Sequence, residues 1–336
     1  MRALVTGGAG YLGSILVEKM LEKGYAVRVL DNLLYGVDSI KRFLADSNFE
    51  LDQGDIRDMT TIVRALKDAD AVIHLASIVG AQAAGLDPKT TIQINYLATR
   101  NIAELCELYE IEKFVFASTC SVYGSQPGRV ITEDSRIEPV DFYAETKVRS
   151  EKAVVESKMP SIILRLGTLF GLSYRMRFDL AINLFIAKAF NKERITVFGG
   201  DQHRPFLHVA DAADAFIFAL EKGLEGVYNV MWDNLSIMDV AKLVSSFIPT
   251  EIEVSQRIVD RRNYRVSSER IKGLGFRTRK DVGDAVVEIR EAFSQGLFQD
   301  YTASIYSNYE SLFKSEETQR KVYTLGPIFR QGDDNR

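Results

Sequence analysis

The chain has 336 residues, of which 46% are hydrophobic, 26% charged and 10% aromatic. This composition excludes collagen-like, low-complexity and largely disordered chains, and the length suits one large domain or two smaller ones. The formal net charge of −4 lacks the basic excess typical of proteins that bind nucleic acids. Two cysteines are too few for a disulfide framework, and no apolar run reaches the roughly 18 residues that a membrane span needs. We therefore expect a cytoplasmic protein with no nucleic-acid or membrane partner.

Short apolar runs alternate with segments of helical period in the first half of the chain. The expected strands are residues 2–6, 26–30, 71–75, 113–117 and 161–166. Segments between them, such as 13–23 and 90–108, place apolar residues three and four positions apart. This alternation is typical of a parallel sheet with crossover helices, so we predict an α/β, doubly wound domain of the Rossmann type over residues 1–166.

The pattern changes after residue 166. Loop-like clusters separate the helices expected near residues 180–191, 210–222, 236–247 and 281–295. We interpret residues 167–325 as a smaller, mixed α/β lobe that closes over a ligand held by the first domain. The polar residues 326–336 are expected to form a disordered tail.

A glycine-rich turn at residues 6–13 follows the first expected strand and opens the first expected helix. Its glycines Gly7, Gly10 and Gly13 permit a tight turn and a close approach of backbone amides to a pyrophosphate, at the positive end of a helix. The alternative is a purely structural turn. Because of its context between strand and helix, we predict that this turn binds a dinucleotide.

Asp31 ends the second expected strand, where a carboxylate hydrogen-bonds the ribose hydroxyls of an adenosine. Asn32, Leu33 and Leu34 follow it, and none of them neutralises a 2′-phosphate, so the sequence favours NAD over NADP. Residues 54–58 and 74–77 follow the next strands and are expected to line the same cofactor. His74 is interpreted as a packed, hydrogen-bonded strand residue rather than a catalyst.

Tyr143 and Lys147 lie four residues apart, on one face of the expected helix. A tyrosine has a pKa near ~10, and a neighbouring cation favours the phenolate that could act as a base. Such a pair also arises by chance, so its value comes from its position in a chain with a dinucleotide turn. Ser118 and Thr119 end another expected strand, where they either bind a substrate alcohol or merely cap the strand. Cys120 has no histidine nearby in sequence and is interpreted as a small core residue rather than a nucleophile.

Together these motifs resemble those of the extended short-chain dehydrogenases/reductases, in particular the nucleotide-sugar epimerase/dehydratase family, over nearly the whole chain. The resemblance implies that Tyr143 is the general base and that Lys147 holds the nicotinamide ribose and lowers the pKa of Tyr143. It implies that Thr119 hydrogen-bonds the reacting hydroxyl of the sugar. The cofactor-binding residues that it implies are Gly7, Gly10, Tyr11, Leu12, Gly13, Asp31, Asn32, Asp55, Ile56, Leu75, Ala76, Ser77, Asn95, Ser118, Tyr143 and Lys147.

In the second lobe, Asn183 resembles the family's diphosphate-contacting asparagine, and Arg204 and Arg262 resemble the arginines that bind the nucleotide's phosphates. A planar guanidinium suits this role because it binds phosphate oxygens in pairs. The alternative for Arg262 is a solvated basic run, since other arginines flank it. The implied substrate-binding residues are Val79, Thr119, Cys120, Ser121, Asn183, Arg204 and Arg262.

Two departures from the family pattern narrow the reaction. Sugar 4,6-dehydratases of the family carry an Asp-Glu pair after the catalytic threonine, where this chain has Cys120 and Ser121. A 3,5-epimerase of the family carries a cysteine at the position of Ser121. The remaining chemistry is oxidation and reduction at one sugar carbon, most often C4. Residues 170–180 also resemble a subgroup that contains both epimerase-like proteins and a sugar C4 dehydrogenase.

We therefore predict an NAD-dependent nucleotide-diphosphate-sugar epimerase that acts at C4 through a transient 4-keto sugar, similar to UDP-glucose 4-epimerases. The alternatives are an NAD(H)-dependent C4 dehydrogenase or 4-ketoreductase, and a non-catalytic dinucleotide-binding protein. Resemblance to the family also implies a homodimer formed through the segments 90–108 and 143–157. No metal site is predicted.

Overall fold

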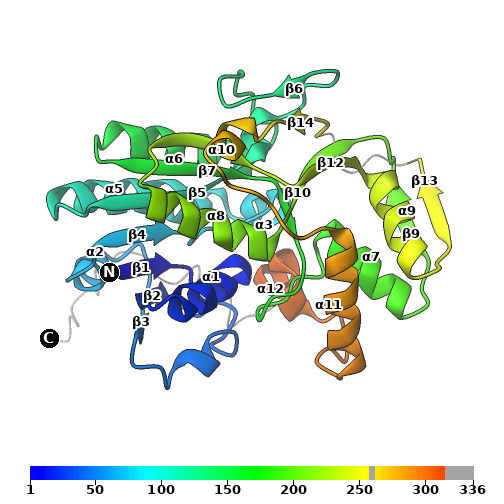
Figure 1. Ribbon diagram of the computed structural model, residues 1–336, viewed down its shortest axis with the longest axis horizontal. Coiled ribbons are helices and arrows are strands. Elements are labelled where there is room, and N and C mark those ends of the chain that lie inside the picture. The colour runs from blue at the N-terminus through cyan, green and yellow to red at the C-terminus, as the bar shows by residue number, and fades with distance from the viewer. Residues whose placement is uncertain (257–261, 315–336) are drawn as a thin grey trace, which may run out of the picture.

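The computed structural model describes residues 1–256 and 262–314 (Figure 1). The tail predicted at residues 326–336 lies outside this part of the chain. Within these described ranges, no helix is both long and apolar enough to cross a membrane.

Seven parallel strands form the central sheet. Its strands are β1 (Arg2–Thr6), β2 (Ala26–Asp31), β3 (Phe49–Gln53), β4 (Ala71–His74), β5 (Lys113–Thr119), β7 (Ser161–Leu166) and β11 (Gly226–Val230). They lie in the order β11-β7-β5-β4-β1-β2-β3, and every neighbouring pair is parallel. The sequence order reverses beside β1, as in a doubly wound sheet. The predicted fold class is confirmed.

Helices cover both faces of this sheet, which is why its strands are apolar on both sides. The helical segments of this region are α1 (Tyr11–Glu22), η1 (Lys41–Phe43), α2 (Met59–Leu66), α3 (Ala81–Leu86), α4 (Pro88–Thr91), η2 (Ile92–Leu97), α5 (Ala98–Leu108), η3 (Cys120–Tyr123), α6 (Phe142–Glu156) and α8 (Val209–Lys222). Alternate strand residues pack into two separate cores. One core joins the sheet to α1 and α8, and the other joins it to α2, α5 and α6.

The strands predicted from the sequence correspond to β1, β2, β4, β5 and β7. One strand of the sheet comes from beyond the boundary predicted at residue 166. The chain leaves β7, builds part of the second lobe, and returns through α8 to place β11 beside β7. Residues 209–230 thus belong spatially to the first lobe.

The second lobe consists of small sheets and further helical segments. Its strands are β6 (Val130–Ile131), β8 (Thr168–Phe170), β9 (Ile195–Phe198), β10 (His203–His208), β12 (Asp233–Ser236), β13 (Ile252–Ser255) and β14 (Arg265–Val266). Its helical segments are α7 (Ala181–Phe190), α9 (Ile237–Phe247), α10 (Glu269–Gly273), α11 (Val282–Ser294), η4 (Ser304–Tyr306) and α12 (Asn308–Lys314). In Figure 1, α7, α9 and α11 lie together on the right, and the strands of the parallel sheet lie to the left.

Two helices of the second lobe, α9 and α11, begin where the sequence supplies a cap. Ser236 and Asp239 form a reciprocal capping box at the start of α9, and Asp281 and Asp284 form another at the start of α11. Each box provides acceptors for backbone amides that lack a partner within the helix. The four helices predicted in this half of the chain are confirmed as α7, α8, α9 and α11.

His74 ends β4 as a fully buried side chain, as expected from the sequence. Its Nδ1 lies 2.6 Å from the hydroxyl of Thr6, its Nε2 lies 2.9 Å from the hydroxyl of Thr99, and its ring stacks on Phe116. Burial, with a smaller contribution from the charge of Lys147, lowers the pKa of His74 to about 3. The imidazole therefore stays neutral and serves the packing of the sheet.

This pKa predicts a loss of stability in mild acid. The unfolded chain binds a proton at His74 below about pH 6.5, whereas the folded chain does not until near pH 3, so stability falls as the pH falls through that window. Between pH 7 and pH 5, His74 should lower the free energy of unfolding by about 2 kcal/mol. Urea titrations of wild type, His74→Gln and the control His203→Gln would measure it. Equal pH slopes in wild type and His74→Gln would contradict the prediction.

Candidate active site

A cavity of about 1140 Å³ lies where the carboxyl ends of the parallel strands meet the second lobe. This edge of the sheet is the usual ligand site of doubly wound folds. Residues predicted from the sequence line both of its sides. They are Gly7, Gly10, Tyr11, Leu12, Gly13, Asp31, Asn32, Asp55, Ile56, Leu75, Ala76, Ser77, Val79, Ser118, Thr119, Ser121, Tyr143, Lys147, Arg204 and Arg262.

The turn between β1 and α1 requires its glycines. Gly7 has a φ of +75°, and a Cβ there would lie 2.7 Å from the backbone nitrogen of Ala76. A Cβ on Gly13 would lie 2.2 Å from the carbonyl oxygen of Gly7. Gly10 precedes the helix and provides no side-chain cap for its first amides. The turn thus fits a dinucleotide, because these amides and the helix dipole face the cavity and suit a pyrophosphate.

Asp31 fits the adenosine end of such a ligand. Its two carboxylate oxygens accept hydrogen bonds from the amides of Ala9 (3.0 Å) and Leu33 (2.8 Å), which ties the carboxylate to the glycine-rich turn. Burial raises the pKa of Asp31, and these two amides act against that rise. Each oxygen keeps acceptor capacity for a ribose hydroxyl. Asn32 beside it lines the cavity, in agreement with an unphosphorylated ribose.

Tyr143 and Lys147 project from the first turns of α6 into the same cavity. The Nζ atom of Lys147 donates to the carbonyl oxygen of Ala117 (2.9 Å) and lies 4.8 Å from the ring centroid of Phe116. Burial lowers the pKa of Lys147 to about 7, and the carboxylate of Glu151 acts against that change. The charge of Lys147 is therefore poised near neutral pH, and an anion that forms nearby would favour its protonated form.

The phenol of Tyr143 is held in its neutral form by its surroundings. Burial raises the pKa of Tyr143, and the carboxylate of Asp141 adds to the rise. The guanidinium groups of Arg177 and Arg262 act in the opposite direction. A base at this position consequently needs more positive charge than the side chains provide, and a bound oxidised nicotinamide would supply it.

Thr119 ends β5 beside these two side chains, and its hydroxyl oxygen accepts from the amide of Ser121 (3.1 Å). Arg262, from the second lobe, donates through Nη1 to the hydroxyl of Ser121 (3.1 Å). The guanidinium of Arg204 lies 5.7 Å from the ring centroid of Tyr264, a residue whose electrostatic neighbours include Arg262. The structure therefore gathers the two predicted phosphate-binding arginines at one end of the cavity.

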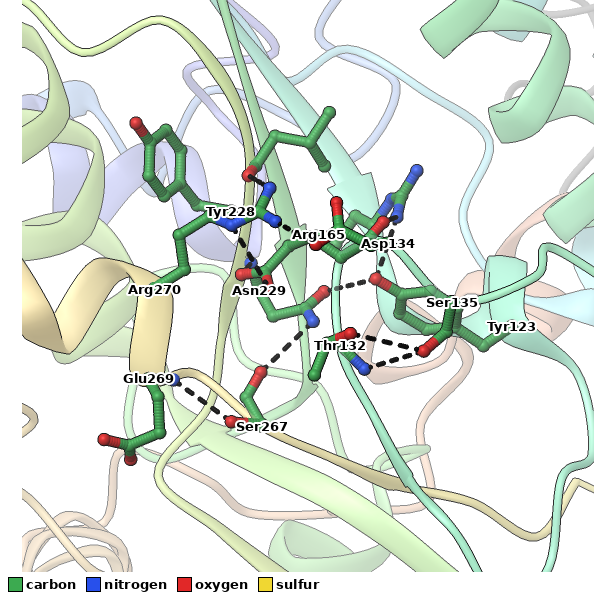
Figure 2. Close-up of polar contacts among 12 residues, drawn as sticks. Tyr123, Thr132, Asp134, Ser135, Arg165, Tyr228, Asn229, Ser267, Glu269 and Arg270 are labelled. Atoms are coloured by element: carbon green, nitrogen blue, oxygen red, sulfur yellow. Dashed lines mark hydrogen bonds and ion pairs between the residues drawn. The ribbon is translucent and has the colours of Figure 1, made fainter.

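A buried polar network lies behind β5 and α6, the strand and the helix that carry Thr119 and Tyr143. Ser118 donates a short hydrogen bond to the carboxylate of Glu151, which also pairs with Arg165 (Nη2 to Oε2, 2.7 Å). Arg165 continues the network through its Nη1 to the hydroxyl of Tyr123 (2.8 Å), and Tyr123 donates to Asn229 (2.8 Å). Figure 2 shows these last three side chains meeting from β7, η3 and β11. The network connects the end of β5 and α6 to β11, the strand that returns from the second lobe.

Three predicted residues lie outside the cavity lining. Cys120 is fully buried, and its thiol donates to the carbonyl oxygen of Arg165 (3.2 Å), so its side chain lies in a core and its substrate contact stays a prediction. The side-chain amide of Asn95 accepts a hydrogen bond from the backbone N–H of Ile78. It donates to the carbonyl oxygen of Ile78 and to the hydroxyl of Thr146. It therefore positions the loop after β4 against α6, instead of reaching the ligand cavity.

Asn183 is likewise engaged inside the protein. Its Oδ1 accepts from the amide of Gly171 (2.9 Å), and its Nδ2 donates to the hydroxyl of Tyr11 (3.1 Å) and the carbonyl oxygen of Arg177 (2.9 Å). Its side-chain groups are thus engaged by the protein, and the diphosphate contact of Asn183 stays a prediction. Asn183 links the second lobe to the start of α1.

Several cavity-lining residues were not predicted from the sequence. They are Tyr35, Arg175, Arg177, Asp179, Tyr264 and Asn308. The two arginines of residues 174–180 were an available signal, but nothing in their spacing indicates that both face the cavity. Asn308 at the start of α12 carries no sequence motif, and only the tertiary fold brings it to the site.

The glycine turn, the Tyr-Lys pair and the second lobe together define an extended dinucleotide-dependent enzyme of the short-chain dehydrogenase/reductase type. Residues 3–230 match the model of the NAD dependent epimerase/dehydratase family. The chain belongs to this family.

Known relatives within the family differ in their reactions. The chain is 33% identical over 225 residues to a putative UDP-glucose 4-epimerase of Methanocaldococcus jannaschii, which covers 65% of this chain and 72% of the relative. It is 27% identical over 299 residues to the human dTDP-D-glucose 4,6-dehydratase, and this match covers 82% of this chain and 85% of the relative. The fold is similar to the crystal structure of the Thermus thermophilus UDP-glucose 4-epimerase in complex with NAD, with a TM-score of 0.77 and 28% identity. This match covers 88% of this chain and 99% of that chain.

The network behind the site generates a prediction about stability. Replacing Glu151 by Gln should leave Arg165 buried without its counter-charge and lower the free energy of unfolding by about 3–5 kcal/mol. Glu156→Gln on the same helix is the control, because Glu156 is exposed and should change stability by less than about 0.5 kcal/mol. Chemical denaturation of both variants would measure the difference. Equal stabilities would show that the Glu151–Arg165 pair does not support the fold.

Proposed function

We propose that the protein is an NAD-dependent nucleotide-diphosphate-sugar epimerase that acts at C4 of the sugar. The observation that carries the proposal is the composition of a single cavity. A dinucleotide turn, two arginines suited to a diphosphate, and the side chains of Thr119, Tyr143 and Lys147 all line it. Its relatives from Methanocaldococcus jannaschii and Thermus thermophilus, both named as UDP-glucose 4-epimerases, support the same reaction class.

Residues of both lobes have defined tasks in this reaction. Bound NAD supplies the reversible oxidation of the sugar alcohol to a ketone. Tyr143 accepts the proton of the C4 hydroxyl as that oxygen becomes a carbonyl and returns the proton in the reverse direction. Thr119 hydrogen-bonds the reacting oxygen, and Lys147 holds the nicotinamide ribose while its ammonium stabilises the Tyr143 phenolate. Arg204 and Arg262 hold the diphosphate while the sugar turns to present its other face.

The residues after Thr119 argue against a 4,6-dehydration. Elimination of water requires an acid and a base close to the sugar. Cys120 is buried in a core, and burial raises the pKa of its thiol, so it is no base. Ser121 accepts a hydrogen bond from Arg262 and offers no ionisable group. The human relative named as a 4,6-dehydratase therefore shares the fold of this chain, and we do not extend its reaction to it.

The proposal includes a homodimer and a cytoplasmic location. Helices α5 and α6 pack side by side, and the exposed apolar residues Leu108 and Val155 support a partner helix pair against them. The two cysteines are both buried and unpaired, which suits a reducing compartment.

Retention of the cofactor tests the epimerase against the dehydrogenase. An epimerase regenerates its cofactor in every cycle, so the purified protein should release near-stoichiometric NAD(H) on denaturation. It should also interconvert nucleotide sugars with no cofactor added. Quantification of nicotinamide nucleotide in the supernatant measures this. An empty protein that binds NAD(H) reversibly and consumes it would instead indicate a C4 dehydrogenase or 4-ketoreductase.

Removing the proposed base tests the assignment of Tyr143. The variant Tyr143→Phe should lose about 10²–10⁴-fold or more in turnover, because no other group takes the proton, and should still bind NAD. Tyr109→Phe is the control, since Tyr109 is an exposed residue at the end of α5. Turnover with a nucleotide-sugar substrate and NAD content would be measured in parallel. Full activity of Tyr143→Phe would exclude this residue as the base.

A further inference from the structure

Arg175 is a buried cation at the cavity that forms no ion pair of its own with the residues that the structure describes. Its side chain is 6% exposed, and its guanidinium carbon lies 3.7 Å from the ring centroid of Tyr35. Its Nη1 donates to the side-chain oxygen of Asn308 (2.7 Å), and its Nη2 lies 3.4 Å from the carbonyl oxygen of Ile305. In the part of the chain that the structure describes, its Nε finds no acceptor.

The nearest carboxylate is already engaged by another arginine. Asp179 accepts from both Nε (2.9 Å) and Nη2 (2.8 Å) of Arg177, and it also acts electrostatically on Arg175, so one carboxylate serves two guanidinium groups. A buried charge is costly unless an opposite charge compensates it. Burial also lowers the pKa of Arg175 to about 10, which leaves it charged at neutral pH. The arrangement is therefore suited to an anion that arrives with a ligand.

The segment that carries Arg175 lies across the first turn of α1. The hydroxyl of Tyr11 donates to the carbonyl oxygen of Gly171 (2.6 Å), and the hydroxyl of Ser173 donates to the carbonyl oxygen of Tyr11 (2.6 Å). Ser14 and Ser173 also lie within hydrogen-bond distance (3.2 Å). These contacts place the segment opposite the helix terminus that suits a pyrophosphate.

We propose that Arg175 binds the diphosphate of NAD from the second lobe, opposite the glycine-rich turn. The side of its guanidinium that lines the cavity supplies positive charge and charge-assisted donors, and Tyr35 and Asn308 hold the group in place. The inference rests on the proposed use of NAD and adds a residue outside the Rossmann sheet to the cofactor site. The cofactor is then held between two lobes, so that it leaves only when the segment at residues 171–180 is displaced.

The location of Arg175 favours the dinucleotide over the nucleotide sugar. Tyr35, on which Arg175 stacks, follows β2, and the electrostatic neighbours of Tyr35 include Asp31 of the adenosine end. The arginines assigned to the sugar nucleotide instead gather around Ser121 and Tyr264. The diphosphate of NAD and the diphosphate of the nucleotide sugar thus have separate cationic partners.

NAD affinity of stripped protein tests the assignment without relying on turnover. Wild type, Arg175→Gln and Arg175→Lys would be freed of bound nucleotide and refolded, checked by circular dichroism, and titrated calorimetrically with NAD, NADP and UDP. Arg175→Gln should bind NAD about 10–100-fold more weakly, the loss expected for a hydrogen bond to a charged group. Arg175→Lys should fall between the two, because it keeps the charge and loses the planar stack. UDP affinity should be unchanged in both.

Arg42→Gln is the matched control, because Arg42 also stacks on a tyrosine, Tyr174 (4.3 Å), but is exposed and lies outside the cavity lining. It should bind NAD as wild type does. Unchanged NAD affinity in Arg175→Gln, or in a folded Arg175→Lys if the glutamine variant does not fold, overturns the inference. Weakened binding of UDP alone, or of NADP alone, also overturns it. A wild type that binds NAD in an Arg175-dependent way but converts no nucleotide sugar would sustain this inference and refute the proposed epimerase.

Discussion

The parallel arrangement of the strands is the constraint on which the site depends. Because all seven strands run in one direction, their carboxyl ends share one edge, and each following loop contributes to one cavity. The glycine turn, Asp31, the loop after β4 and Thr119 reach the cavity in this way. No single loop holds enough groups for chemistry at a sugar carbon. The sheet supplies the precision, because its strands are buried on both faces and cannot shift independently.

Electrostatic balance organises the second level of the site. Burial moves the pKa of Tyr143 upward and that of Lys147 down to about 7, so each group is displaced toward its neutral form. Glu151 opposes the change at Lys147 and is itself balanced by Arg165. Tyr143 and Lys147 therefore lie at the end of a series of buried charged groups that continues through Glu151 and Arg165. Ligand charges complete the balance, which couples proton transfer to occupancy of the site.

Local patterns in the sequence were sufficient for the fold class, most strands and the placement of Tyr143 and Lys147 on one helix, because each depends on residues close together in the chain. The glycine turn, the position of Asp31 after a strand and the spacing of Tyr143 and Lys147 are all short-range patterns of this sort, readable from neighbouring residues. The membership of β11 in the main sheet was not predictable in this way, because it depends on pairing with β7 across a long excursion. The same limit applies to Asn183 and Arg175. Both are polar residues in one stretch, and only packing decides that one faces Tyr11 and the other the cavity.

The return of the chain through α8 and β11 has a consequence for how the protein can be divided. The family match ends at residue 230, the last residue of β11, and not at the end of β7. A fragment that stopped at residue 166 would leave β7 as an unprotected apolar edge and would uncover the face of α1 that packs on α8. The two lobes are thus interleaved rather than consecutive. Exchange of substrate lobes between relatives would have to preserve residues 209–230 with the first lobe.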